Sequence, residues 1–125
     1  DMRGGSRSRT LLGSGFVLTK HDMDWFQDTY LDGSGLEVTD PRVSPLLADD
    51  LAGLSPALVV TAGFDPLRDE GDQYADRMRE AGVAVDHRRM GSMTHVFLNF
   101  NVLGGAVAAA NAEMISALRA HLAHG

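Results

Sequence analysis

Two phrases, TAGFDPLRDEG at residues 61–71 and GSMTHVF at residues 91–97, decide the fold of this chain. Before and within the first phrase, an apolar run at about 57–62 has the length and branching of a buried strand. A helix is expected at about 66–81, because proline fits its first turn and acidic residues favour its N-terminal end. Alternating residues then predict a second strand at about 83–89. A strand, a helix and a strand in this order form a parallel pair, so the predicted fold class is α/β.

A carboxylate and an imidazole fall at one edge of this sheet. Asp65 follows the first strand and His95 follows the second, and parallel sheets place their chemistry beyond the carboxyl ends of the strands. The pair matches the acid and base of a Ser-His-Asp triad, in which the acid orients the imidazole and stabilises its charged form. Each residue also has a simpler explanation, since an aspartate before proline often caps a helix and a lone histidine is often structural. Asp69 and Glu70 are most simply acids of the helix start, and Asp69 is placed to bond backbone amides that hold the Asp65 turn.

Three motifs resemble those of the hormone-sensitive-lipase-like (GDXG) esterases, a branch of the α/β-hydrolase fold. They are PRVSPL (residues 41–46), PALVVTAGFDPLRDEG (residues 56–71) and MTHVF (residues 93–97). The resemblance extends from Asp1 to about His121 and implies the C-terminal part of an α/β-hydrolase fold. In that family the aspartate of the Asp-Pro-Leu phrase and the histidine of the last motif are the triad acid and base. The resemblance therefore implies that Asp65 and His95 have these catalytic roles in a carboxylesterase or lipase.

This sequence also departs from the family's motifs. The nucleophile of these enzymes lies in a Gly-x-Ser-x-Gly motif upstream of the acid, together with a glycine-rich oxyanion motif. None of the serines here has glycine two residues before and two residues after it. We therefore expect the last third of an esterase, with the nucleophile and oxyanion hole absent and no activity from this chain alone. Val96 replaces the usual glycine after the histidine, where a branched side chain is expected to crowd the pocket or restrict the backbone.

The composition argues against several classes of function. A formal charge of -6 and a pI near 5.1 argue against a nucleic-acid partner. The chain has no cysteine, so disulfides and thiolate chemistry are excluded. No apolar stretch reaches the ~18 residues that span a bilayer, so we expect no membrane span. A cytoplasmic location is a separate expectation. The adjacent acids Asp49 and Asp50 lack further oxygen ligands nearby in sequence, and neither a metal nor another cofactor is expected.

Two further helices are expected, at about 20–31 and about 105–123. Thr19 to Asp22 resemble a capping box, and residues 1–9 have the composition of a loop. A group of large apolar and aromatic side chains on the first helix is either core or the wall of an acyl-binding pocket. It comprises Met23, Trp25, Phe26 and Tyr30. The second helix is expected to bury a stripe comprising Val107, Ala110, Met114, Ile115, Leu118 and Leu122, and to end with His121 and His124 at its negative end. His87 lies inside the second strand, with a surface or packing role.

The preferred interpretation is the C-terminal portion of a serine carboxylic-ester hydrolase that acts on a small, uncharged ester. Its partners are then the N-terminal half of the same hydrolase and a second copy of the chain. The resemblance implies a homodimer through residues 83–89 and the last helix. Two alternatives stay open. The chain is either an assembly element with an exposed strand edge, or a non-catalytic relative in which Val96 impairs the base.

Overall fold

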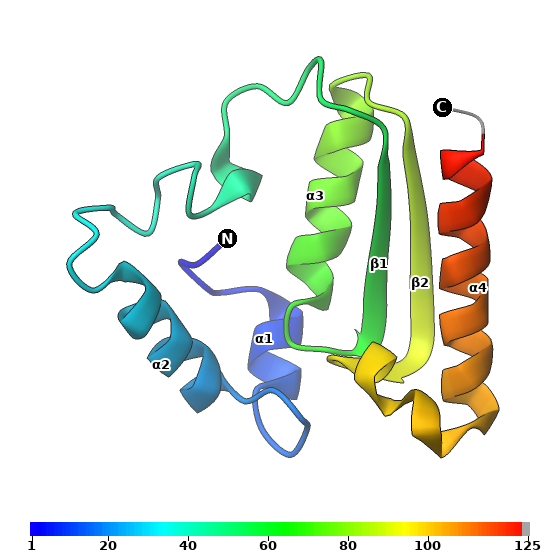
Figure 1. Cartoon of the computed structure of the whole chain (residues 1–125). Coiled ribbons are helices and arrows are strands. Elements are labelled where there is room, and N and C mark those ends of the chain that lie inside the picture. The colour runs from blue at the N-terminus through cyan, green and yellow to red at the C-terminus, as the bar shows by residue number, and fades with distance from the viewer. Residues whose placement is uncertain (124–125) are drawn as a thin grey trace.

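Two parallel strands, β1 (Ala57–Phe64) and β2 (Val85–Thr94), form the centre of the fold (Figure 1). The structure is a computed structural model that describes residues 1–123. Helix α3 (Arg68–Glu80) connects the strands, so the strand, helix and strand occur in the expected order. Both strands end later than expected, at Phe64 rather than about 62 and at Thr94 rather than about 89. Helix α3 begins after residue 66, because residues 65–67 form a turn of their own.

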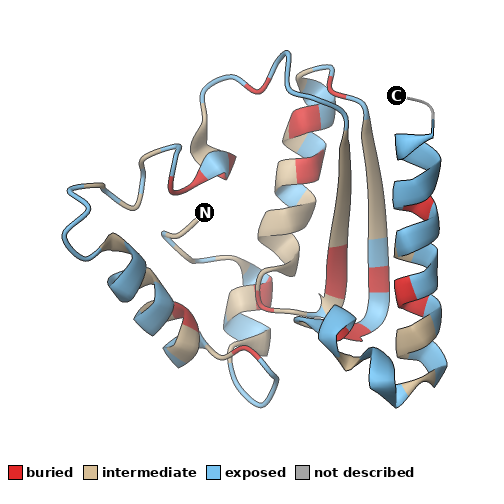
Figure 2. Cartoon of the chain, viewed as in Figure 1, coloured by how far each residue is buried: buried red, intermediate tan, exposed pale blue. Residues whose placement is uncertain are grey.

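The strand pair is covered by a helix on each face. Val59 of β1 packs with Met78 of α3, whereas Val60 and Ala62 pack in a second cluster with Ala110 of α4 (Gly105–Leu122). Successive side chains of a strand point to opposite faces, which explains why neighbouring residues of β1 join different clusters. Figure 2 shows buried residues along α3, in both strands and on α4. The result is a helix, sheet and helix arrangement in three layers.

A close backbone approach shapes the carboxyl ends of the two strands. The regular register runs to the pair Ala62 and Met90, and pairing then resumes at Phe64 and Thr94 after an irregularity. A Cβ placed on Gly63 would lie 1.9 Å from the carbonyl oxygen of Gly91, so the irregularity requires glycine at position 63. Phe64 and Thr94 are thereby paired at the sheet edge, and the residue after each of them lies at the same edge.

The N-terminal part contributes helices α1 (Arg7–Leu12) and α2 (Lys20–Leu31) and the short 3-10 helix η1 (Pro45–Leu47). The capping box predicted at the start of α2 is confirmed, with Thr19 and Asp22 bonded reciprocally. The loop expected at residues 1–9 is wrong in its last part, because the Ser6 hydroxyl caps a helix that begins at Arg7. In Figure 1, α1 lies between α2 and α3.

The C-terminal part consists of the 3-10 helix η2 (Phe97–Leu103) and α4. Helix α4 buries the small residues Ala110, Asn111 and Ala117 rather than the whole predicted stripe. Three of the predicted core residues are exposed: Ile115 by 43%, Leu118 by 45% and Leu122 by 73%. A sheet of two strands is too narrow to cover the whole apolar stripe of α4. Among the helices of residues 1–123, none has an apolar stretch of the length that spans a bilayer. His121 contacts Asp86 of β2, and His124 lies outside the described residues.

His87 is a buried packing residue rather than a surface residue. Its side chain is 1% exposed, and its Nε2 lies 3.0 Å from Thr61 Oγ1 and 3.1 Å from Asp72 Oδ1. Within residues 1–123, its buried Nδ1 has no hydrogen-bond partner. Burial lowers the pKa of His87 below its ordinary value, against the attraction of Asp72. The imidazole is therefore neutral in the folded protein near neutral pH.

This burial predicts a pH dependence of stability. Below about pH 6.5 the unfolded chain protonates at His87 before the folded chain does, so stability falls as the pH drops through this region. His87→Gln should remove that component, which is measured as the difference in Tm between about pH 7.5 and about pH 5.5. The exposed His21 provides the control, since His21→Gln should keep the wild-type difference. An unchanged difference in His87→Gln would contradict the prediction.

Candidate active site

The structure brings Asp65 and His95 together at the carboxyl edge of the sheet. His95 Nδ1 lies 2.8 Å from Asp65 Oδ2, although the residues are 30 positions apart in the chain. A carboxylate only accepts hydrogen bonds, so Nδ1 carries a proton and donates a hydrogen bond to Asp65. The side chains are 29% and 13% exposed, respectively. This tautomer leaves Nε2 as a lone-pair acceptor, which is the state that a general base requires.

The turn after β1 holds the Asp65 carboxylate in place. Asp65 Oδ1 accepts a hydrogen bond of 2.8 Å from the Leu67 amide, and the Asp65 carbonyl accepts one of 3.1 Å from the Arg68 amide. The Arg68 guanidinium reaches back to donate to the carbonyl of Gly63. Pro66 is fully buried. One oxygen of Asp65 is therefore committed to its own turn, and the other is directed at His95.

Val96, directly after His95, has a strained backbone. Its φ of 53° and ψ of 23° lie in the left-handed region, and it is the one residue other than glycine with positive φ among residues 1–123. A β-branched residue is disfavoured there by contact between its side chain and the backbone. The next residue, Phe97, is buried in the cluster on the α4 face. Val96 thus occupies a conformation that valine disfavours, and it is not among the residues that line the cavity beside His95.

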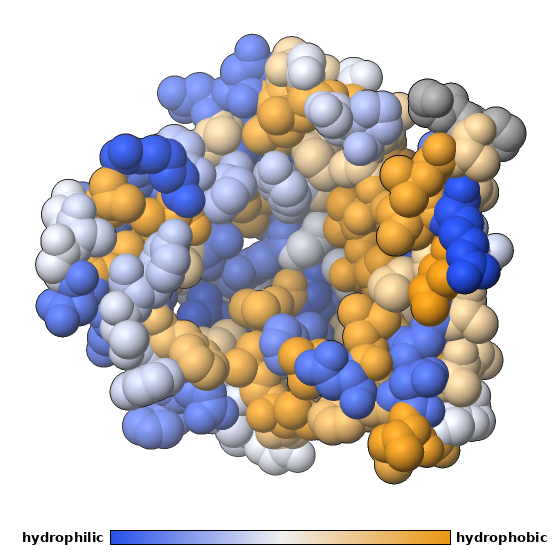
Figure 3. All heavy atoms as spheres, in the orientation of Figure 1, coloured by the Kyte–Doolittle hydropathy of each residue, from blue (hydrophilic) through white to orange (hydrophobic). Residues whose placement is uncertain are grey.

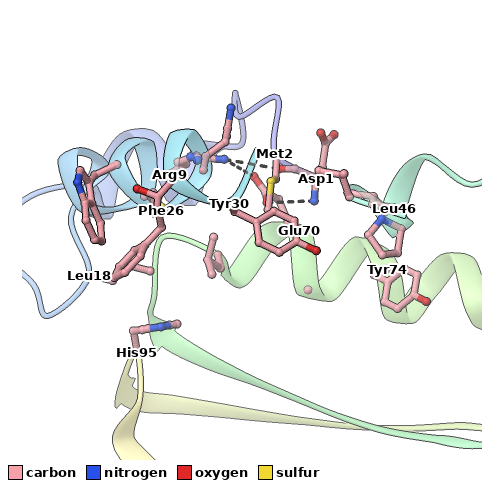
Figure 4. A pocket seen from close by; sticks show the side chains of 18 residues that line it. Asp1, Met2, Arg9, Leu18, Phe26, Tyr30, Leu46, Glu70, Tyr74 and His95 are labelled. Carbon is pink, nitrogen blue, oxygen red and sulfur yellow. Dashed lines mark hydrogen bonds and ion pairs between the residues drawn. The ribbon is translucent and has the colours of Figure 1, made fainter. Parts of the chain in front are cut away.

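His95 lines a cavity of about 880 Å³ between the N-terminal helices and α3. The wall is mainly apolar, and its larger side chains are Leu18, Met23, Trp25, Phe26, Tyr30, Val43, Leu46, Leu67 and Tyr74. Figure 3 shows this face of the molecule hollowed near its centre. In Figure 4, His95 lies at one end of the cavity wall and Tyr74 at the other, with the ion pair of Arg9 and Glu70 between them.

The aromatic side chains of α2 belong to the cavity wall rather than to a core. Met23 is buried, whereas Trp25, Phe26 and Tyr30 are each more than half exposed and line the cavity. Of the two interpretations of this group, the pocket wall therefore fits better than the core. In the described part of the chain, no serine hydroxyl is hydrogen-bonded to His95. Residues 1–123 also contain no cluster of three or more metal-ligating side chains.

Comparison with known proteins identifies the family. A family model described as the alpha/beta hydrolase fold matches residues 1–99. The chain belongs to the α/β-hydrolase family. The carboxylic ester hydrolase LipN of Mycobacterium tuberculosis is 58% identical over 122 residues, which cover 98% of this chain and 32% of the relative. The ethyl acetate hydrolase of Pseudomonas putida is 34% identical, with 88% of this chain and 34% of the relative covered. The predicted relationship to the hormone-sensitive-lipase-like carboxylesterases is confirmed.

Solved α/β-hydrolase structures agree with this assignment. An α/β-hydrolase enzyme from the metagenome of Lake Arreo superposes with a TM-score of 0.81 at 39% identity, covering 98% of this chain and 38% of that one. A thermostable esterase from Pseudomonas putida gives a TM-score of 0.79 at 38% identity, covering 88% and 35%. The predicted α/β-hydrolase fold is therefore confirmed. The chain spans about a third of the length of the relatives that it matches.

Sequence reasoning missed one residue that touches the site. Ser8 of α1 is completely buried and contacts the turn that carries Asp65, whereas the sequence predicted only a loop there. Its partner residues lie 58 and 61 positions away. No local signal marks this serine, because the stretch around it is rich in glycine, serine and arginine. The expected contact of Asp69 with a backbone amide is present, but the amide belongs to Ser8 and not to the Asp65 turn.

The strain at Val96 predicts that Val96→Gly stabilises the protein. Glycine adopts the left-handed conformation without the penalty of roughly 1–2 kcal/mol, although it loses more backbone entropy on folding. The expected gain is about 1 kcal/mol in the free energy of unfolding, measured by urea denaturation. Val102→Gly, at an exposed position of η2, should lower the stability instead. A loss of stability in Val96→Gly would show that the side chain contributes more than the strain costs.

Proposed function

We propose that the hydrolase containing this chain is a serine carboxylic-ester hydrolase, in which Asp65 is the triad acid and His95 the base. The observation that carries the proposal is the 2.8 Å contact between His95 Nδ1 and Asp65, with His95 at the wall of an apolar cavity. The names of the relatives support the same reaction, since they are carboxylic ester and ethyl acetate hydrolases. The role follows the site geometry rather than the fold alone.

The proposed reaction uses His95 twice. A serine of the hydrolase attacks the ester carbonyl carbon while Nε2 of His95 accepts the hydroxyl proton, and backbone amides stabilise the oxyanion. The proton then passes to the departing alcohol as the carbon–oxygen bond breaks, which leaves an acyl-enzyme. Water attacks the acyl-enzyme, again with His95 as base, and the acid and free serine are released. Asp65 fixes the tautomer and stabilises the imidazolium in both halves. We propose that the serine lies outside this chain, which is then inactive alone.

The cavity favours an uncharged ester with a short or medium acyl chain. Most of its lining side chains are aliphatic or aromatic. Its charged side chains are paired, Glu70 with Arg9 at 3.6 Å and the Asp1 carboxylate with Arg3 at 2.7 Å. A volume of about 880 Å³ is within the range of small-molecule pockets. The net charge of -6 disfavours an anionic ester. No residue of this proposal requires a cofactor, and the cytoplasmic location stays a prediction that cell fractionation tests.

Substitution of the two triad residues tests the proposal in the full-length hydrolase. Asp65→Asn and His95→Ala should each lower kcat/KM for 4-nitrophenyl butyrate by about 10³-fold or more, because both remove the base or its orientation. The matched control is His21→Ala, an exposed histidine of α2 that does not line the cavity, which should retain wild-type activity. Full activity in His95→Ala would overturn the assignment. Turnover by the 125-residue chain alone would overturn the proposed location of the serine.

A second candidate role is assembly through exposed apolar surface. Within residues 1–123, β1 pairs only with β2, which leaves its other edge without a strand. We propose that further polypeptide of the same hydrolase pairs with this edge, since the relatives are about three times longer than the stretch matched. The exposed residues Ile115, Leu118 and Leu122 of α4 favour a contact with a second copy.

The dimer is tested by size-exclusion chromatography with light scattering on the full-length hydrolase. A dimer is expected, and the double variant Leu118→Glu and Leu122→Glu should convert it into a monomer by placing charges in the apolar contact. Val102→Glu is the control, because Val102 is more exposed but lies in η2 rather than α4. A monomeric wild-type protein would contradict the proposed contact between copies.

A further inference from the structure

Two helices far apart in sequence cap each other beside the Asp65 turn. The Ser8 amide donates to Asp69 Oδ2 at 2.7 Å, and the Asp69 amide donates to Ser8 Oγ at 3.1 Å. Ser8 is the second residue of α1 and Asp69 is the second residue of α3. Amides in the first turn of a helix have no partner within the helix. Each residue therefore satisfies a free amide at the start of the other helix.

This reciprocal cap replaces a local one. The N-cap residue of α3 is Leu67, which has no polar side chain and makes no capping hydrogen bond. A leucine at this position offers no side-chain acceptor, so the amide of Asp69 is bonded by the remote Ser8 instead, whereas the amide of Arg68 bonds the Asp65 carbonyl. Burial alone would raise the pKa of Asp69, but hydrogen bonds from Ser8 and Arg68 outweigh it and hold the pKa below its ordinary value. The carboxylate of Asp69 is thus ionised at neutral pH, which strengthens the hydrogen bond that it accepts from the α1 amide.

The same serine also holds the residue next to Asp65. Ser8 Oγ donates to the Pro66 carbonyl at 2.8 Å, while its lone pairs accept from Asp69. Both Ser8 and Pro66 are fully buried, so water cannot replace this bond in the structure. Pro66 lies between Asp65, which bonds His95, and Leu67, whose amide holds the other oxygen of Asp65. The Asp65 turn is therefore held by α1 through the Pro66 carbonyl, in addition to its own internal hydrogen bonds.

We propose that Ser8 and Asp69 are positioning residues that hold the Asp65 carboxylate against His95, an inference that rests on the proposed function of that pair. They act through the Pro66 carbonyl and the start of α3 and touch neither substrate nor the reacting atoms. Loss of the serine hydroxyl leaves the Pro66 carbonyl and the Asp69 amide without partners in a buried place. The turn then relaxes, and the acid moves relative to the imidazole.

The test uses the full-length hydrolase and 4-nitrophenyl butyrate. Ser8→Ala should lower kcat by about 10- to 100-fold and leave KM within about twofold, because a displaced acid weakens the chemical step and not substrate binding. Asp69→Ala should act in the same way, and Asp69→Asn should recover part of the loss by keeping an oxygen for the Ser8 amide. If Ser8→Ala does not fold, the comparison of Asp69→Ala with Asp69→Asn provides the test.

Two neighbours of Ser8 on the same segment provide matched controls. Ser6→Ala removes the local cap of α1, where Ser6 Oγ accepts from the Arg9 amide, and its contacts with Ser8 Oγ at 3.4 Å and Glu70 Oε1 at 3.3 Å. It leaves the three hydrogen bonds that join Ser8 to Pro66 and Asp69. It should lower Tm with little change in kcat. Thr10→Ala changes an exposed hydroxyl that bonds within α1 and should change neither. A kcat loss in Ser6→Ala equal to that in Ser8→Ala would show a general effect of α1 stability and overturn the positioning role.

A double-mutant comparison separates positioning from simple destabilisation. In the Asp65→Asn background, Ser8→Ala should cause no further loss of kcat, because the carboxylate that it positions is gone. If the two losses multiply, Ser8 acts independently of Asp65 and the proposal is overturned.

A spectroscopic readout keeps the proposal testable apart from the proposed function. The proton between His95 Nδ1 and Asp65 should give a downfield proton resonance by NMR in the wild-type protein. Ser8→Ala should shift or abolish this resonance, and Thr10→Ala should keep it. An inactive wild-type hydrolase with this response would refute the proposed function but retain the positioning role. An active enzyme whose resonance is unchanged by Ser8→Ala would retain the proposed function and refute the positioning role.

Discussion

The parallel pairing of β1 with β2 is the constraint on which the site depends. It brings Asp65 and His95, 30 residues apart, to one sheet edge, and the glycine contact between residues 63 and 91 sets how the strands end. A side chain at position 63 would push the strand ends apart. Such a shift would break the 2.8 Å contact between the side chains of Asp65 and His95. The hydrogen bond between Asp65 and His95 thus depends on backbone packing two residues before the aspartate and four residues before the histidine.

Much of this centre was predictable from the sequence because its signals are local. The apolar run of β1, the acidic start of α3 and the alternation in β2 each appear within a short window. The motif around Asp65 added the family. The exact start of α3 was not predictable from the proline alone, since the Asp65 side chain bonds the Leu67 amide and closes a turn before the helix. Proline is compatible with either structure, and the side-chain bond decides between them.

The features that the sequence did not reveal depend on distant partners. Whether Phe26 and Tyr30 are core or pocket wall depends on what lies opposite α2, and helical spacing is the same in both cases. The outward position of Leu118 and Leu122 likewise depends on the width of the sheet beneath α4. The role of Ser8 depends on atoms 58 and 61 residues away, in a stretch whose composition is typical of a loop.

Strain and support lie on opposite sides of the same hydrogen bond. On the histidine side, Val96 has a left-handed conformation that is unfavourable for a branched side chain. The next residue, Phe97, is buried. On the aspartate side, the turn is bonded through the Leu67 amide within the loop and through Ser8 from α1. A strained backbone persists only where its surroundings fix it. The aspartate side is thus held from two directions, whereas the histidine side contains the strained residue.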